Sequence, residues 1–107
     1  MQLYWKKRGR VLYASLEGEL DQHNAGDLRD KLNRLLEDDG IERIEYELSG
    51  VTFMDSSGIG VLLGRYRTLE KRHGSMDVKG ASRAIERILR MAGIYGLCTK
   101  EDSVNEK

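Results

Sequence analysis

The chain has 107 residues, and its 18 lysines and arginines balance its 18 aspartates and glutamates, so the formal net charge is zero. A chain of this length forms one domain that can bury a core without a metal or disulfide, and the absence of a basic excess argues against direct nucleic-acid binding. The single cysteine, Cys98, cannot form an internal disulfide, which suits a reducing compartment. Because the first ten residues hold no long apolar run, we expect a cytoplasmic protein without a membrane segment.

The N-terminal third predicts a hairpin followed by a helix. Residues 3–20 fit two short strands around a tight turn at Arg8-Gly9, where glycine permits the backbone reversal. Apolar residues then follow helical spacing from Ala25 to Leu36, with Asn24 as the expected N-cap. We expect Gly40 to end this helix, as glycine often does at the position after the C-cap.

Two further strands show alternating patterns. Residues 43–49 and 76–80 place apolar side chains on one side and charged ones on the other. Strands covered by helices on both faces usually have continuous apolar runs instead. The helices are therefore expected to cover mainly one face of the sheet, leaving the other at least partly hydrated.

Two more helices are expected in the second half of the chain. One begins at or just after Ser56 and Ser57, and the cations of residues 71–73 suit its solvated C-terminal end. Its buried stripe is expected at Ile59, Leu62, Leu63, Tyr66 and Leu69. The other is capped by Ser82 and is expected to bury Ile85, Ile88, Leu89 and Ala92. Residues 94–99 fit a short final strand, and residues 100–107 are a polar tail.

The resulting order of elements is ββαβαβα with a short last strand. Strands that alternate with helices indicate an α/β domain with right-handed crossovers. We therefore predict one domain over residues 1–107, with a mostly parallel sheet of four to five strands and an N-terminal hairpin.

The segment FMDSSGIGVLLGRY, residues 53–66, holds the candidate site. A hydrolase nucleophile elbow needs Gly-x-Ser-x-Gly, but Met54 stands where the first glycine of that motif would precede Ser56, and neither histidine is placed to act as base. A phosphate-binding loop would need Gly-Lys-Ser/Thr, which is absent. The glycines weakly resemble a dinucleotide fingerprint, which leaves a small nucleotide-binding domain as an alternative.

Helix capping explains part of this segment. Either serine could accept from the first-turn amides, and Asp55 suits the positive helix end. Capping leaves Gly58 and Gly60 unexplained, since each glycine costs about 1 kcal/mol relative to alanine in a helix. Bare backbone at the helix start indicates a docking surface. A phosphoserine there would be accommodated by the helix N-terminus and would change that surface strongly.

The same segment resembles the phosphorylation motif of the bacterial anti-anti-sigma factors, which are STAS domains. The resemblance extends upstream to GELDQHNAGDLRDKL and downstream through MDVKGASRAIERILRMAGI, so it covers nearly the whole chain. SSGIGVLLGRY is most similar to the sporulation branch of the family. A general-stress or other signalling assembly is the alternative within the family.

The resemblance implies a partner-switching regulator with no catalytic residue, no metal and no cofactor. Ser56 would be the phosphoacceptor, and Ser57 is expected to turn inward as the cap. The implied partners are an ATP- or ADP-bound anti-sigma factor with serine kinase activity and a serine phosphatase of the PP2C type. The expected partner-facing surface comprises Asp21, His23, Asp55, Ser57, Gly58, Ile59 and Gly60.

Overall fold

A computed structural model describes residues 1–99, so the predicted polar tail at 100–107 lies outside the described part of the chain. The strands are β1 (Gln2–Arg8), β2 (Val11–Leu20), β3 (Arg43–Met54) and β4 (Ser75–Lys79). The helices are α1 (Ala25–Leu35), α2 (Ser56–Glu70) and α3 (Arg83–Met91), followed by the 3₁₀ helix η1 (Ile94–Leu97).

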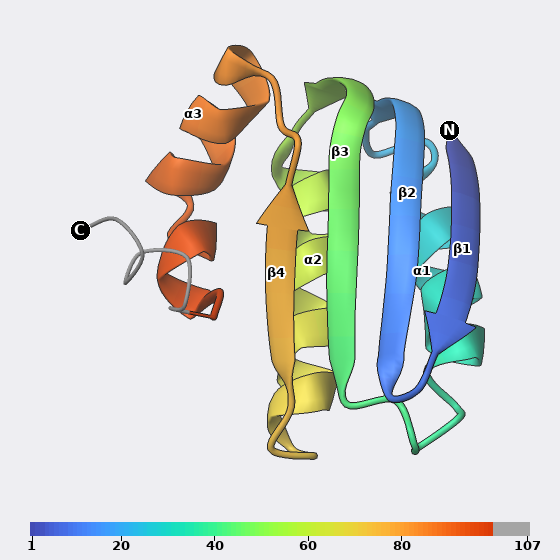
Figure 1. The fold of residues 1–107 in the computed structure, drawn as a ribbon. Helices are drawn as coiled ribbons and strands as arrows, with labels where there is room; N and C mark the ends of the chain where they lie inside the picture. Colours follow the sequence, from blue (N-terminus) through green and yellow to red (C-terminus); the bar gives the residue numbers. More distant parts are fainter. Residues whose placement is uncertain (100–107) are drawn as a thin grey trace.

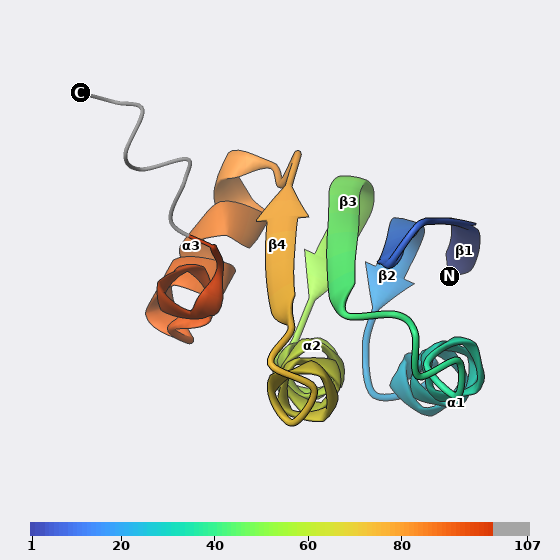
Figure 2. The ribbon, with the colours of Figure 1, turned by 60° about the horizontal axis from the view of Figure 1, so that its bottom comes forward.

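The four strands form one mixed sheet in the order β1-β2-β3-β4 (Figure 1). β1 pairs antiparallel with β2, whereas β2, β3 and β4 are parallel to one another. Both α1 and α2 lie on one face of this sheet, and α3 lies at its β4 edge (Figure 2). The α/β architecture, the hairpin and the one-sided helical cover are therefore confirmed.

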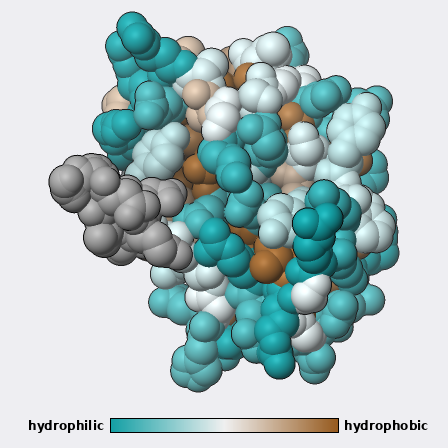
Figure 3. Space-filling view, in the orientation of Figure 1, coloured by the Kyte–Doolittle hydropathy of each residue, from teal (hydrophilic) through white to brown (hydrophobic). Residues whose placement is uncertain are grey.

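The uncovered face of the sheet carries mainly polar side chains, with apolar patches visible between them (Figure 3). Lys79 Nζ lies 2.7 Å from Glu45 Oε2, and Arg43 pairs with Asp77 on the same face. The opposite side of β3 supplies core residues, namely Ile44, Tyr46 and Leu48. The alternation in β3 thus separates a hydrated face from the core, as predicted.

Two chain reversals differ from prediction. The hairpin turns at Gly9-Arg10, one residue later than expected, with Gly9 at φ 60°. Gly40 does not end α1, which stops at Leu35 with Leu36 as its C-cap. A distant side chain stabilises this end instead, because Arg72 donates to carbonyl oxygens of the α1 end and the loop after it. Arg72 is therefore a structural residue rather than a solvated cation at the end of α2.

The buried face of α2 is rotated relative to the predicted stripe. Leu62 and Leu69 are buried as expected, whereas Ile59, Leu63 and Tyr66 are only half-buried. The positions that complete the buried face are Gly58, Val61 and Arg65. Apolar residues surround much of this helix, so their spacing alone does not define which side meets the sheet.

The C-terminal elements confirm the cap of α3 and the burial of Ile85 and Leu89, whereas Ile88 is only half-buried and two further predictions are wrong. Ser82 caps α3, since its Oγ accepts from Ile85 N at 3.2 Å. Ala92 is exposed, because α3 ends one residue before it. Residues 94–99 contain a 3₁₀ helix and no strand, because Gly93 (φ 81°) turns the chain so that Ile94 packs into the core. Within residues 1–99 the sheet therefore has four strands.

Candidate functional site

The ends of two parallel strands bring the predicted site residues together. Leu20, the last residue of β2, pairs with Met54, the last residue of β3. Asp21 and Asp55 therefore leave the sheet at the same edge, and Asp55 N donates to Leu20 O at 3.3 Å. The loop before α1 and the start of α2 thus form one continuous surface.

The start of α2 is capped by Asp55. Its Oδ1 accepts from Ser57 N at 2.9 Å, and its carbonyl accepts from the amides of Gly58 and Ile59. The predicted cap by a serine is therefore wrong: a carboxylate acceptor already serves the first turn. Ser56 is exposed and Ser57 half-buried, and neither hydroxyl is hydrogen-bonded within residues 1–99.

The loop before α1 is held by its own side chains. Asn24 Oδ1 accepts from Asp21 N at 3.1 Å, and Asn24 Nδ2 donates to Glu19 O at 2.6 Å. The side chain of this predicted N-cap therefore bonds to residues that precede it and does not cap α1. Asp21 Oδ1 accepts from His23 N at 2.9 Å. The Asp21 side chain remains 22 % exposed and that of His23 83 % exposed, so both reach the surface.

The two helix starts enclose a groove of about 410 Å³, which we call the α1–α2 groove. Its lining residues are Gln22, Ala25, Gly26, Arg29, Ser57, Gly60 and Val61. A Cβ atom at Gly60 would meet nothing within 4 Å, so this glycine exposes the α2 backbone. The expectation of bare backbone at the helix start therefore holds at Gly60.

Gly58 has a different role. It is buried, and a Cβ atom there would lie 2.7 Å from Leu20 Cγ and 2.8 Å from Met54 Cγ. Such distances are far below van der Waals contact. Gly58 thus allows α2 to approach the strand ends. The expectation that its backbone is open to a partner is therefore wrong. The neighbouring Ile59 is half-buried and packs partly against the core.

Sequence reasoning missed two arginines on the helices beside the site. Arg29 of α1 lines the α1–α2 groove, and Arg65 of α2 does not line it and is only 8 % exposed. The signal for Arg65 was its spacing of four residues from Val61 and Leu69, which places all three on one side of a helix. Reading α2 by its apolar residues alone concealed this position.

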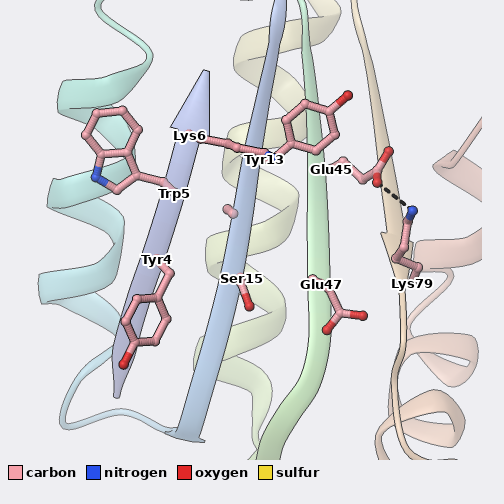
Figure 4. Close-up of a pocket in the computed structure, with 9 residues that line it drawn as sticks. Tyr4, Trp5, Lys6, Tyr13, Ser15, Glu45, Glu47 and Lys79 are labelled. Atoms are coloured by element: carbon pink, nitrogen blue, oxygen red, sulfur yellow. Dashed lines mark ion pairs between the residues drawn. The ribbon is translucent and has the colours of Figure 1, made fainter. Parts of the chain in front are cut away.

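A second hollow lies on the open face of the sheet (Figure 4). It has a volume of about 300 Å³, and Tyr4, Tyr13 and Lys79 are among its lining residues. The dashed line in Figure 4 marks the Lys79–Glu45 ion pair at one side. None of the predicted site residues lines this hollow. The candidate site is therefore the surface formed by the loop before α1 and the start of α2.

Neither a metal centre nor a membrane-spanning helix is present among residues 1–99. Across residues 1–99 no group of three His, Cys, Asp or Glu side chains could hold a metal ion. In the same part of the chain, every helix is too short or too polar to cross a bilayer.

Comparisons with known proteins all point to the same family. The STAS domain model matches residues 3–106. The chain is 34% identical over 95 residues to the anti-sigma F factor antagonist of Paenibacillus polymyxa, covering 89% of this chain and 81% of that protein. It is 35% identical over 92 residues to the anti-sigma-B factor antagonist of Bacillus subtilis, covering 86% and 80%.

Solved structures agree with this grouping. The phosphorylated form of the Bacillus cell fate determinant SpoIIAA superposes with a TM-score of 0.72 at 25% identity, covering 97% of each chain. The sequence matches exceed two thirds of both curated relatives. The chain therefore belongs to the STAS domain family, among the anti-sigma factor antagonists, which are regulators and not enzymes.

Proposed function

We propose that this chain binds an anti-sigma factor and thereby releases a sigma factor, and that phosphorylation of Ser56 ends the binding. The observation that supports this most is the state of Ser56. It is the first residue of α2, exposed, and free of a capping role because Asp55 fills it. Its hydroxyl can therefore be modified without loss of a hydrogen bond that the fold needs.

The switch follows from electrostatics at a helix start. A phosphate on Ser56 would add about −1.5 to −2 charges at a site where the helix dipole favours negative charge, so the domain would stay folded. It would also place this charge beside Asp55 and next to the α1–α2 groove. A partner surface that fits the neutral serine would clash with the bulky phosphate. If that partner surface carries a carboxylate, the two negative charges would also repel each other.

The remaining roles belong to the partners. The anti-sigma factor, with ATP bound, would be the serine kinase, and a metal-dependent phosphatase of the PP2C type would restore Ser56. We propose a cytoplasmic protein that uses no cofactor. Sporulation is favoured by the segment SSGIGVLLGRY, while the 35% identity to a sigma-B antagonist keeps the general-stress assembly as a second candidate.

The test is a binding and phosphorylation experiment with purified anti-sigma F and anti-sigma B factors. The unphosphorylated chain should bind one of them with ADP and become phosphorylated with ATP, and tandem mass spectrometry should locate phosphate on Ser56. Ser56→Ala should bind and resist phosphorylation, while the matched variant Ser57→Ala should still accept phosphate. Phosphate on Ser57, or no binding to either factor, would contradict the proposal.

Asp21 is proposed as a partner contact on the rim beside this site. Asp21→Asn keeps an oxygen that can accept from His23 N but removes the charge. We expect weaker complex formation with a melting temperature within about 2–4 °C of wild type, as for surface substitutions worth less than about 0.5 kcal/mol. Normal binding together with a large loss of stability would make Asp21 a purely structural residue.

A further inference from the structure

Arg65 is a buried cation without a partner. Its Nε and Nη1 atoms are fully buried and donate to no hydrogen-bond acceptor within residues 1–99, and no ion pair there involves its guanidinium. The hydroxyl of Tyr46, from the core side of β3, is buried and unpaired in the same way. Buried polar groups in folded proteins are nearly always paired, so an unpaired guanidinium indicates a missing partner.

The surroundings of Arg65 disfavour its charge. Burial lowers the pKa of Arg65, the nearby Tyr46 partly opposes this, and the positive charge of Arg29 lowers it further. Burial likewise raises the pKa of Tyr46, which leaves the phenol neutral. Arg65 therefore remains a cation, since arginine does not deprotonate in proteins, but lacks a compensating anion.

Arg29 adds a second cation beside it. This residue lines the α1–α2 groove, and its side chain is 54% exposed. Its Nε and Nη2 contact Asp30 Oδ1 at 3.3 Å, in an ion pair whose two members are both about half exposed. Such pairs contribute little, so Arg29 can change partner at small cost.

A stripe of small residues runs along α2 from Ser57, the neighbour of Ser56. Ser57, Gly60 and Gly64 recur at helical spacing on α2, and both glycines have open space where a Cβ would lie. Arg65 directly follows Gly64, one turn beyond Val61, which lines the groove. A partner segment that covers Ser56 can therefore approach the α2 backbone along this stripe, as far as the turn of α2 that carries the buried Arg65.

We propose that the α1–α2 groove receives an acidic side chain of the anti-sigma partner, whose carboxylate is held between Arg29 and Arg65. The planar guanidinium matches a carboxylate, and a poorly hydrated cation forms a stronger pair than an exposed one. This inference rests on the proposed function. It adds a contact separate from the phosphorylated serine, and it gives the buried Arg65 the anion that it lacks.

The test compares two arginine variants with a matched lysine variant. Arg65→Met keeps an unbranched, somewhat shorter side chain and removes the buried charge, so its melting temperature should equal or exceed that of wild type. Its affinity for the anti-sigma factor that binds wild type should fall about tenfold or more, equivalent to about 1.4 kcal/mol. Arg29→Gln should weaken binding and reduce its salt dependence. Lys31→Gln removes one charge from α1 on the side that faces Leu3 of β1, and it should change affinity by less than about twofold.

The outcomes separate this inference from the proposed function. If wild type binds an anti-sigma factor and Arg65→Met binds it equally well, the carboxylate site is wrong while the proposed function stands. If Arg29→Gln weakens binding no more than Lys31→Gln does, the carboxylate site is likewise wrong while the proposed function stands. This comparison of Arg29→Gln with Lys31→Gln decides the matter even if Arg65→Met does not fold. If wild type binds neither anti-sigma factor, the proposed function fails and the inference falls with it.

Discussion

Substituting alanine at Gly58 and at Gly60 separates the packing role of one glycine from the docking role of the other. At Gly58 the new methyl group would lie 2.7 Å from Leu20 Cγ and 2.8 Å from Met54 Cγ. Carbon atoms pack favourably at about 3.5–4.0 Å, so each contact is too short by roughly 1 Å. Neither Cγ atom is the free end of its side chain, so the clash must be relieved by moving α2 or the strand ends.

The two free-energy terms at Gly58 oppose each other. Overpacking costs about 1–3 kcal/mol, while replacing glycine by alanine in a helix gains up to about 1 kcal/mol. We expect Gly58→Ala to lose about 1–2 kcal/mol of unfolding free energy, which lowers the melting temperature by about 4–8 °C for each kcal/mol. Gly60→Ala meets no atom within 4 Å and should be neutral or more stable.

Urea unfolding of both variants measures this difference, provided that their m-values agree with wild type. Binding should show the reverse order: folded Gly58→Ala binds the anti-sigma factor normally, whereas Gly60→Ala places a methyl group in the α1–α2 groove and binds more weakly. A Gly58→Ala protein as stable as Gly60→Ala would refute the packing argument. Normal binding by Gly60→Ala would refute the docking surface at that position.

Three further substitutions, one of them with a control variant, test contacts that hold the fold. Arg72→Ala should cost about 2 kcal/mol or more in urea unfolding because carbonyl oxygens near the end of α1 lose a charged donor, whereas Lys71→Ala, at an exposed neighbour, should stay within about 0.5 kcal/mol of wild type. Asp55→Ala should cost about 1 kcal/mol by removing the α2 cap, and equal stability would mean that another group replaces it. Hydrogen bonds from the Ser49 hydroxyl and amide lower the pKa of Glu47 below its ordinary 4.5, so its stabilising effect is present above pH 4.5 and lost as pH falls. Glu47→Gln should therefore flatten the acid side of a stability-against-pH curve, and an unchanged slope below pH 4.5 would contradict this.

The sequence by itself determined the features that depend on local periodicity. Alternation in residues 43–49 predicted both β3 and its two unlike faces, because side chains on a strand point alternately to opposite sides. The cap at Ser82 was also predictable, since it depends on a hydrogen bond to a residue three positions away. The order of elements identified the parallel sheet, and the motif placed Ser56 at a helix start.

Only the tertiary structure decided which neighbours in the sequence have which role. Gly58 and Gly60 look alike in the sequence, yet the strand ends bury one and the α1–α2 groove exposes the other. Arg72 and Arg65 likewise resemble surface cations until α2 is placed against α1 and the sheet. The physical reason is that residues two apart on a helix point in directions about 200° apart, so their roles depend on how the helix is rotated about its axis. That rotation is set by contacts with chain segments tens of residues away, which a local pattern does not record.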